Sequence, residues 1–92
     1  MSNFEKICKK VSNTLEIKNK MYGNSFEKTY EEYGKAIFCV RLEDKLNRLK
    51  QMVLNGLNAD NTDEKIEDTL LDIAGYAVLA LSVLDNGREE EQ

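Results

Sequence analysis

Apolar residues recur at every third or fourth position along most of the chain, which is the spacing of an amphipathic helix. This spacing predicts a first helix over about residues 3 to 20. Its apolar positions are Phe4, Ile7, Cys8, Val11 and Leu15. The helix is expected to stop at Gly23 and Asn24, because both residue types tolerate the positive φ of a tight turn.

A short helix and then a long one are predicted after this turn. Ser25 is expected to cap the short helix, which ends at Gly34. An aromatic edge runs along it at Phe26, Tyr30 and Tyr33. The long helix spans about Lys35 to Leu57, and Gly56 is expected as its C-terminal cap. Its apolar stripe consists of Phe38, Leu42, Leu46, Leu49, Val53 and Leu57.

The fourth helix is predicted to begin at Asn61 or the residue after it and to run to about Leu84, before a frayed charged tail from Arg88. Asn61, followed three residues later by Glu64, has the pattern of a capping box. The second half of this helix, residues 74 to 84, is apolar on almost every side. A helix without a polar face is buried all round. In so short a chain this favours an interface between copies.

No segment shows the alternation of apolar and polar residues that predicts a β-strand. We therefore predict an all-α fold, a small helical bundle of three main helices plus a short connecting helix, which assembles as a homo-oligomer. The length of 92 residues allows a single all-α domain over residues 1–92.

Composition narrows the chemistry. The chain contains no histidine, so it lacks the usual general base and the usual zinc ligand. Its net charge of −4 argues against direct DNA binding. The most apolar run is shorter than the roughly 20 residues that span a bilayer, so we expect a cytoplasmic protein without a membrane partner. Cys8 and Cys39 are expected to be reduced and packed in the core.

Four carboxylates gather near the start of the fourth helix. Glu64, Asp68 and Asp72 follow one another at four-residue steps, with Glu67 beside them, so they are expected to share a face. Mg²⁺ prefers such hard oxygen ligands and is often held by carboxylates against a substrate phosphate. These four residues are therefore the candidate metal ligands.

A basic face on the third helix is the expected partner of these carboxylates. Arg41, Lys45 and Arg48 lie at helical spacing and are suited to phosphate groups. Lys18, Asn19 and Tyr22, before the first turn, are candidate ligand contacts from another element. Two interpretations stay open at this point. The acidic and basic faces form a salt-bridge network and nothing more, or they also hold a nucleotide.

Taken together, these segments resemble the first nucleotide-modification-associated domain family, found mostly in phage genomes. That family is related by fold to the all-α nucleotide pyrophosphohydrolases of the MazG and helical dUTPase group. The resemblance covers roughly Lys18 to Leu84. The residues that carry it are Lys18, Asn19, Tyr22, Gly23, Ser25, Phe26, Arg41, Leu42, Asp44, Lys45, Arg48, Leu49, Glu64, Asp68, Thr69, Asp72, Ala74, Gly75 and Tyr76.

The resemblance implies a helical oligomer that handles nucleotides. In the pyrophosphohydrolases, two carboxylate pairs on adjacent helices bind Mg²⁺ and the enzyme splits a nucleoside triphosphate into monophosphate and pyrophosphate. The residues of this chain that resemble one of these pairs are Glu64 or Glu67 together with Asp68 and Asp72. Where the other pair is expected, this chain has the mixed segment from Arg41 to Lys45. The pattern therefore assigns no catalytic residue.

Two functions follow as hypotheses. The first is a binding protein that holds a nucleotide or a nucleotide-derived signalling molecule, such as a cyclic nucleotide, at a charged helical interface. A phage could use such a protein for sequestration in the host cytoplasm, as an anti-defence protein. The alternative is a Mg²⁺-dependent nucleoside triphosphate pyrophosphohydrolase of the MazG-like type. A purely structural assembly protein is the third reading.

Overall fold

The computed structural model describes residues 2–22, 24–55 and 63–91, and these residues confirm the all-α prediction. They form four α-helices and one π-helical segment, and they contain no strand. The elements are α1 (Asn3–Tyr22), α2 (Ser25–Tyr33), α3 (Ala36–Lys50), the π-helix η1 (Gln51–Asn55) and α4 (Asp63–Glu91).

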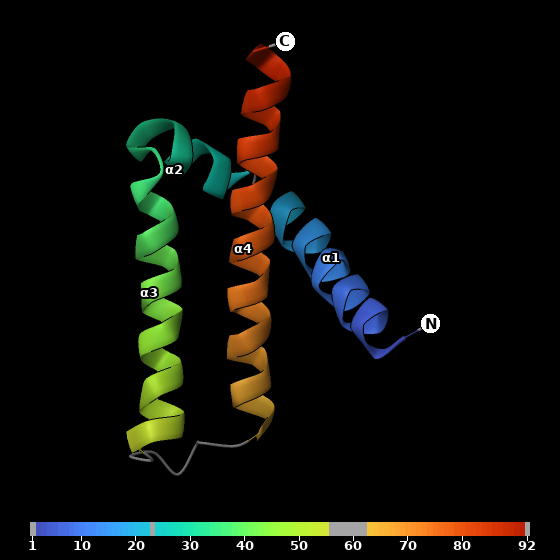
Figure 1. The fold of residues 1–92 in the computed structure, drawn as a ribbon, viewed down its shortest axis with the longest axis vertical. Coiled ribbons are helices and arrows are strands. Elements are labelled where there is room, and N and C mark those ends of the chain that lie inside the picture. Colours follow the sequence, from blue (N-terminus) through green and yellow to red (C-terminus); the bar gives the residue numbers. More distant parts are fainter. Residues whose placement is uncertain (1, 23, 56–62, 92) are drawn as a thin grey trace.

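Helices α3 and α4 run antiparallel side by side and form a long hairpin (Figure 1). Helix α2 crosses near one end of the hairpin and contacts both of its helices. Helix α1 lies against the other side of α4 and is inclined to it, so that its N-terminal end projects away from the hairpin (Figure 1). The chain therefore places α4 between α1 and α3.

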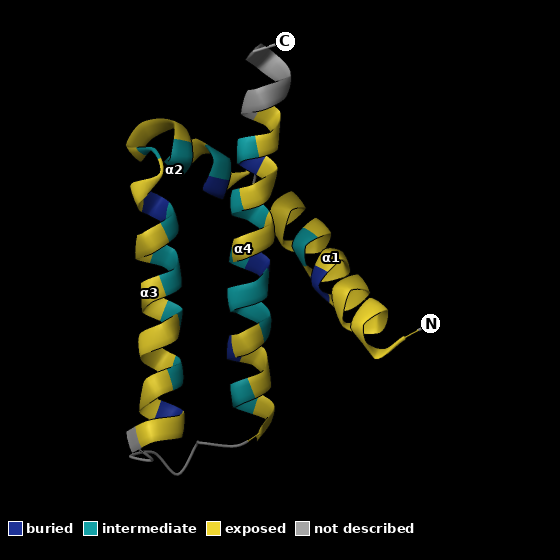
Figure 2. Ribbon diagram, viewed as in Figure 1, coloured by how far each residue is buried: buried dark blue, intermediate teal, exposed yellow. Residues whose placement is uncertain are grey.

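The main hydrophobic cluster forms where α2 meets the hairpin. Phe26, Ile37 and Val83 are its buried members, and aromatic rings from α2, α3 and α4 pack around them. The rings of Phe26 and Phe38 are stacked with centroids 6.1 Å apart, and those of Tyr30 and Phe38 are 5.4 Å apart. Elsewhere, buried positions are few and lie along the contacts between helices (Figure 2). Phe26 and Tyr30 of the aromatic edge predicted for α2 therefore belong to this cluster, whereas Tyr33 is 65% exposed.

The turn between α1 and α2 depends on Asn24, which adopts a left-handed conformation with φ 60°. The Asn19 side-chain amide donates a hydrogen bond to the side-chain oxygen of Asn24, which holds the end of α1 against the turn. Asn24 also occupies the N-cap position of α2. The sequence-based assignment of Ser25 as the cap was wrong, because Ser25 is already the first residue of the helix.

Helix ends differ from the prediction in two places. The third helix does not continue as a uniform α-helix, because its last turn opens into the π-helical segment Gln51–Asn55. The fourth helix does not end near Leu84 but continues to Glu91. No proline stops it there, and an interior glycine costs a helix only about 1 kcal/mol. The expected caps at Gly56 and Asn61 lie outside the described residues.

The two cysteines correct another expectation. Both Cys8 and Cys39 are exposed free thiols and do not pack in the core of the chain. Cys8 lies on the half of α1 that projects beyond α4, where Phe4 and Ile7 are also exposed. Cys39 lies on the flank of α3 that turns away from α4. The general tendency of cysteine to be buried could not predict which helix faces pack against another helix.

Candidate functional site

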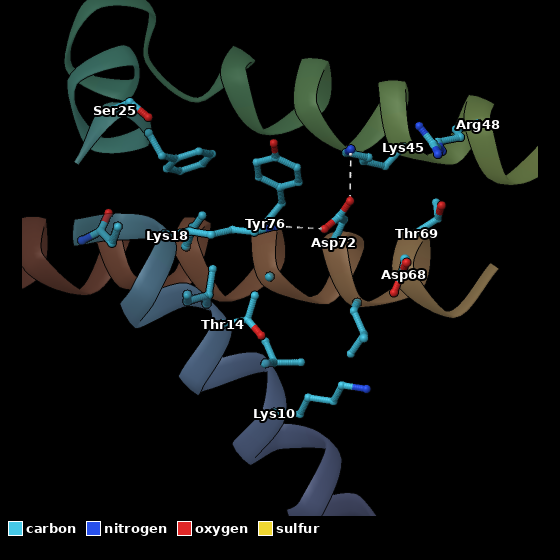
Figure 3. A pocket seen from close by; sticks show the side chains of 17 residues that line it. Lys10, Thr14, Lys18, Ser25, Lys45, Arg48, Asp68, Thr69, Asp72 and Tyr76 are labelled. Atoms are coloured by element: carbon cyan, nitrogen blue, oxygen red, sulfur yellow. Dashed lines mark ion pairs between the residues drawn. The ribbon is translucent and has the colours of Figure 1, made fainter. Parts of the chain in front are cut away.

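A pocket of about 690 Å³ lies between α1, α3 and α4, and α2 covers one end of it (Figure 3). Its volume falls in the range of small-molecule sites, which are commonly about 300 to 1,000 Å³. All four α-helices contribute side chains, so the pocket forms within one chain.

The basic side of the pocket comes from two helices. Lys18 and Asn19 line it from α1, and Lys45 and Arg48 line it from α3 (Figure 3). The structure thus brings together four of the six residues predicted to bind a nucleotide. The Arg48 side chain is exposed, and the described residues contain no ion-pair partner for it. Its guanidinium is therefore available to an anionic ligand.

The two remaining predicted contacts are not part of this lining. Arg41 is half-buried on α3, one helical turn before Lys45, and does not line the pocket. Tyr22 is the last residue of α1, and its side chain lies outside what the structure describes. The basic face of the third helix is consequently divided. Its later residues reach the pocket and Arg41 does not.

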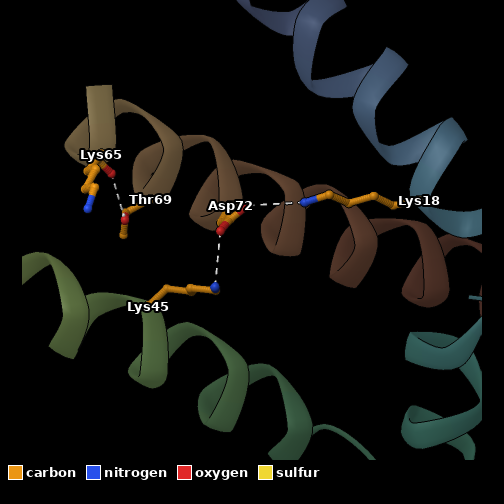
Figure 4. A network of polar contacts seen from close by, with 5 residues as sticks. All are labelled: Lys18, Lys45, Lys65, Thr69 and Asp72. Atoms are coloured by element: carbon orange, nitrogen blue, oxygen red, sulfur yellow. Dashed lines mark hydrogen bonds and ion pairs between the residues drawn. The ribbon is translucent and has the colours of Figure 1, made fainter. Parts of the chain in front are cut away.

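Asp72 on α4 links the two basic helices (Figure 4). One carboxylate oxygen lies 3.5 Å from the Lys18 ammonium and the other lies 3.1 Å from the Lys45 ammonium. The Asp72 side chain is 32% exposed and that of Lys45 is 27% exposed, so the ion pair between them is partly shielded from bulk water. One carboxylate therefore holds α1 and α3 at the same point of α4.

The carboxylates predicted to bind a metal do not gather in one place. Asp68 and Asp72 line the pocket, whereas Glu64 and Glu67 do not. Glu67 pairs with Lys10 of α1 at 3.2 Å. Glu67 and Asp72 are five residues apart, which places them about 140° apart around a helix. Among residues 2–22, 24–55 and 63–91, no three acidic, cysteine or histidine side chains are grouped closely enough to hold a metal ion.

Several pocket residues were not identified from the sequence. Lys10 and Thr14 precede Lys18 at four-residue steps, and this spacing was the signal that could have placed all three on one face. Thr69 is only 2% exposed, and its hydroxyl donates a hydrogen bond to the carbonyl oxygen of Lys65 at 3.0 Å (Figure 4). These residues extend the polar part of the pocket along α1 and α4.

An aromatic end of the pocket was also missed. Phe26 of α2 and Tyr76 of α4 line it next to each other, with ring centroids 6.1 Å apart (Figure 3). Phe26 is buried and Tyr76 is half-buried. The pocket therefore has aromatic rings at one end and the cations of α3 toward the other. No spacing rule within one helix predicts this contact, because the rings come from separate elements.

Gly75 sets the distance between α1 and α4 at the floor of the pocket. It is buried, and a Cβ at this position would lie 3.4 Å from Cδ2 of Leu15. This would be an ordinary van der Waals contact, so the approach of α1 to α4 leaves room for a methyl group at this position but not for a larger side chain. This approach brings Thr14 and Lys18 over the same part of α4 that carries Asp72.

Comparison with known proteins identifies a family for this chain. No curated protein and no solved structure shows significant similarity to the chain. Within the part of the chain that the structure describes, no helix has the length and apolar character to span a membrane. A family model does match residues 18–84, which include every element of the pocket except the first part of α1. The chain therefore belongs to the family described as nucleotide modification associated domain 1.

Proposed function

We propose that this chain binds a nucleotide or a nucleotide-derived signalling molecule, such as a cyclic nucleotide, in the pocket between α1, α3 and α4. Binding without turnover is the proposed activity. The biological role that follows is sequestration of the molecule in the cytoplasm of a phage-infected host, as an anti-defence protein. The protein acts in this proposal as a homo-oligomer.

The observation that carries the proposal is that two kinds of side chain, cationic and aromatic, line the same pocket. Arg48, Lys45 and Lys18 supply cations for phosphate groups, and arginine offers two parallel hydrogen bonds to them. Tyr76 and Phe26 supply aromatic faces at the other end. Aromatic rings stack on bases of any sequence, with about 1 to 3 kcal/mol per base. A ligand with both a base and a phosphate matches this polarity.

The state of Asp72 also supports binding over hydrolysis. Two lysines already neutralise this carboxylate, so it is occupied by the cations that a phosphate would otherwise take. A ligand phosphate can replace the carboxylate on Lys18 or Lys45 without creating an unpaired charge in the pocket. The site then exchanges one anion for another, which is the chemistry of a binding protein.

The second candidate function is a Mg²⁺-dependent nucleoside triphosphate pyrophosphohydrolase of the MazG-like type. One observation favours it, because Asp68 and Asp72 lie one helical turn apart and both line the pocket. Two carboxylates of this kind fit Mg²⁺, which usually completes its shell with water and substrate phosphate. In that case the ion would polarise a phosphoryl oxygen, and Lys45 and Arg48 would orient the phosphates.

Charge reversal at Arg48 tests the proposed site. Arg48→Glu places a carboxylate where a phosphate is expected, so it should weaken nucleotide binding at least about 100-fold, the effect of roughly 3 kcal/mol. Lys50→Glu is the matched control. It makes the same charge change on an exposed residue of α3 that does not line the pocket. Equilibrium binding of a labelled nucleotide measures both variants.

The comparison has a clear negative outcome. If Arg48→Glu binds the nucleotide as tightly as the unmodified protein does, the ligand does not use this cation and the proposed site is wrong. If Arg48→Glu and Lys50→Glu both weaken binding by the same factor, the effect comes from the net charge of the protein, and the proposed site is again wrong.

A further inference from the structure

The surface of the hairpin opposite the pocket carries exposed apolar side chains, and no other helix among the described residues covers it. Successive residues of an α-helix are about 100° apart around its axis. Leu81 lies nine residues after Asp72, which places it about 180° around α4 from the pocket. Leu46 lies two residues before Arg48, which places it about 160° around α3 from the pocket. Both leucines therefore face away from the site.

These positions belong to one continuous surface, which we call the back face. Its exposed members are Cys39 and Leu46 on α3, Val53 on η1, and Leu70, Ala77 and Leu81 on α4. Because α3 and α4 lie side by side and both sets turn away from the same pocket, the two rows adjoin each other. Half-buried leucine and isoleucine side chains lie between the rows.

The apolar side chains of the back face are more exposed than large apolar side chains usually are. Leu81 is 66% exposed and Val53 is 54% exposed, although both are large apolar side chains. The row on α4 from Ile66 to Leu84 contains no charged side chain at its successive positions. These positions are Ile66, Leu70, Ile73, Ala77, Leu81 and Leu84. A contiguous exposed apolar surface of this kind marks an interaction site.

The total surface of the chain, to which the projecting half of α1 contributes as well as the back face, leaves room for an interface of standard size. The chain exposes 7171 Å². A compact monomer of its mass, 10.6 kDa, exposes about 5,500 Å². The difference is about 1,700 Å², which exceeds the roughly 800 Å² that each partner buries in a standard interface. The radius of gyration of 15.0 Å likewise exceeds the roughly 12 Å of a compact domain of this length.

We propose that the back face binds the back face of a second copy of this chain, so that two α3–α4 hairpins form a four-helix bundle. An apolar row on each of two antiparallel helices is complementary to itself under a two-fold rotation. Four helices that bury such rows around one core are a stable architecture. The exposed members of the back face carry no charge, and the charged residues beside them on α3, Glu43 and Lys50, are one of each sign, which favours a copy with the same face.

The inference specifies the homo-oligomer named in the proposed function and adds a consequence. Each pocket lies on the outer side of its hairpin, so the pairing leaves both pockets open. Oligomerisation and nucleotide binding then become separable. Loss of either one can be measured without loss of the other.

A charge in the centre of the back face tests the pairing. Leu81→Glu should convert the protein from two chains, or a multiple of two, to a single chain, as measured by light scattering after gel filtration without nucleotide. Ile17→Glu is the matched control. Ile17 is an apolar residue with a similar exposed fraction, 62%, but it lies on α1. This control should keep the mass of the unmodified protein. Circular dichroism verifies that both variants are helical.

The two cysteines supply a second readout that does not depend on a variant folding. Both thiols are exposed in the single chain, but only Cys39 lies on the back face. Pairing should slow the reaction of Cys39 with a bulky maleimide at least tenfold relative to Cys8, and Leu81→Glu should remove that difference. A wild-type mass of one chain would overturn the proposal. So would an oligomer in which Cys39 reacts as fast as Cys8.

Discussion

At the scale of single residues, Asp72 is the point on which the candidate site depends. It pairs with Lys18 of α1 and with Lys45 of α3, so one carboxylate fixes the relative position of three helices. Exposed ion pairs add at most about 1 kcal/mol to stability. The larger effect of Asp72 is electrostatic, because it occupies the two cations that an anionic ligand needs.

Replacement of Asp72 separates the two candidate functions. Under the binding account, Asp72→Asn removes the competing anion from Lys18 and Lys45, so affinity for the nucleotide should rise several-fold, while unfolding free energy falls by about 1 kcal/mol. Under the hydrolase account, the same change removes a metal ligand, so Mg²⁺-dependent turnover should be lost. Titration calorimetry and a pyrophosphate assay on one preparation measure both effects. Weaker binding in Asp72→Asn would contradict the binding account.

Helical spacing within one helix placed four candidate residues at the pocket, although it did not set Arg41 and Glu64 apart from them. Lys45 and Arg48 follow helical spacing on α3, and Asp68 and Asp72 follow it on α4, and all four line the pocket. The aromatic end could not be predicted in this way, because its rings come from two helices that meet only in the fold. The four predicted metal ligands are divided, because Asp68 and Asp72 line the pocket whereas Glu67 lies about 140° from Asp72 around the helix axis. Their role as metal ligands stays a prediction.

At the scale of the elements, the packing of α1 against α4 determines whether the pocket has a floor. Few residues make this contact, since Val11 is the buried hydrophobic residue that α1 contributes. Leu15 lies over Gly75, and ion pairs to Glu67 and Asp72 lie on either side of that point. The helices themselves followed from apolar spacing. Their mutual angle did not, because it depends on this single close approach.

A methyl group at Gly75 tests the closeness of that approach. The added Cβ would lie 3.4 Å from Leu15, which is ordinary van der Waals contact. Gly75→Ala should therefore raise the free energy of unfolding by about 0.5 to 1 kcal/mol, because alanine favours a helix interior over glycine. Chemical denaturation measures this change. Ala74→Gly, the converse change at the neighbouring position, should lower stability by a similar amount.

The contrary outcome for this pair is equally informative. If Gly75→Ala is destabilised while Ala74→Gly behaves as expected, α1 lies closer to α4 than the structure places it. Gly75→Leu should destabilise the protein and weaken nucleotide binding together, since its side chain displaces Leu15 and with it the α1 wall of the pocket.

At the scale of the whole molecule, the α3–α4 hairpin has two different sides. One side carries cations, carboxylates and aromatic rings around a pocket that α1 encloses. The other side is apolar and exposed. The all-α class could be predicted from the sequence, because apolar residues recur at helical spacing. Pairing with a second copy through the apolar half of α4 stays a prediction. The position of the pocket within a single chain could not be predicted, because it requires the arrangement of four helices.

The central claim is that the pocket holds a nucleotide without consuming it. The most direct measurement incubates the purified protein with nucleoside triphosphates and cyclic nucleotides in the presence of Mg²⁺ and follows each compound by chromatography, before and after heat denaturation. Our account predicts that one nucleotide leaves the free pool and returns intact on denaturation, and that Arg48→Glu abolishes its capture. The appearance of nucleoside monophosphate and pyrophosphate would contradict that account and establish the hydrolase instead.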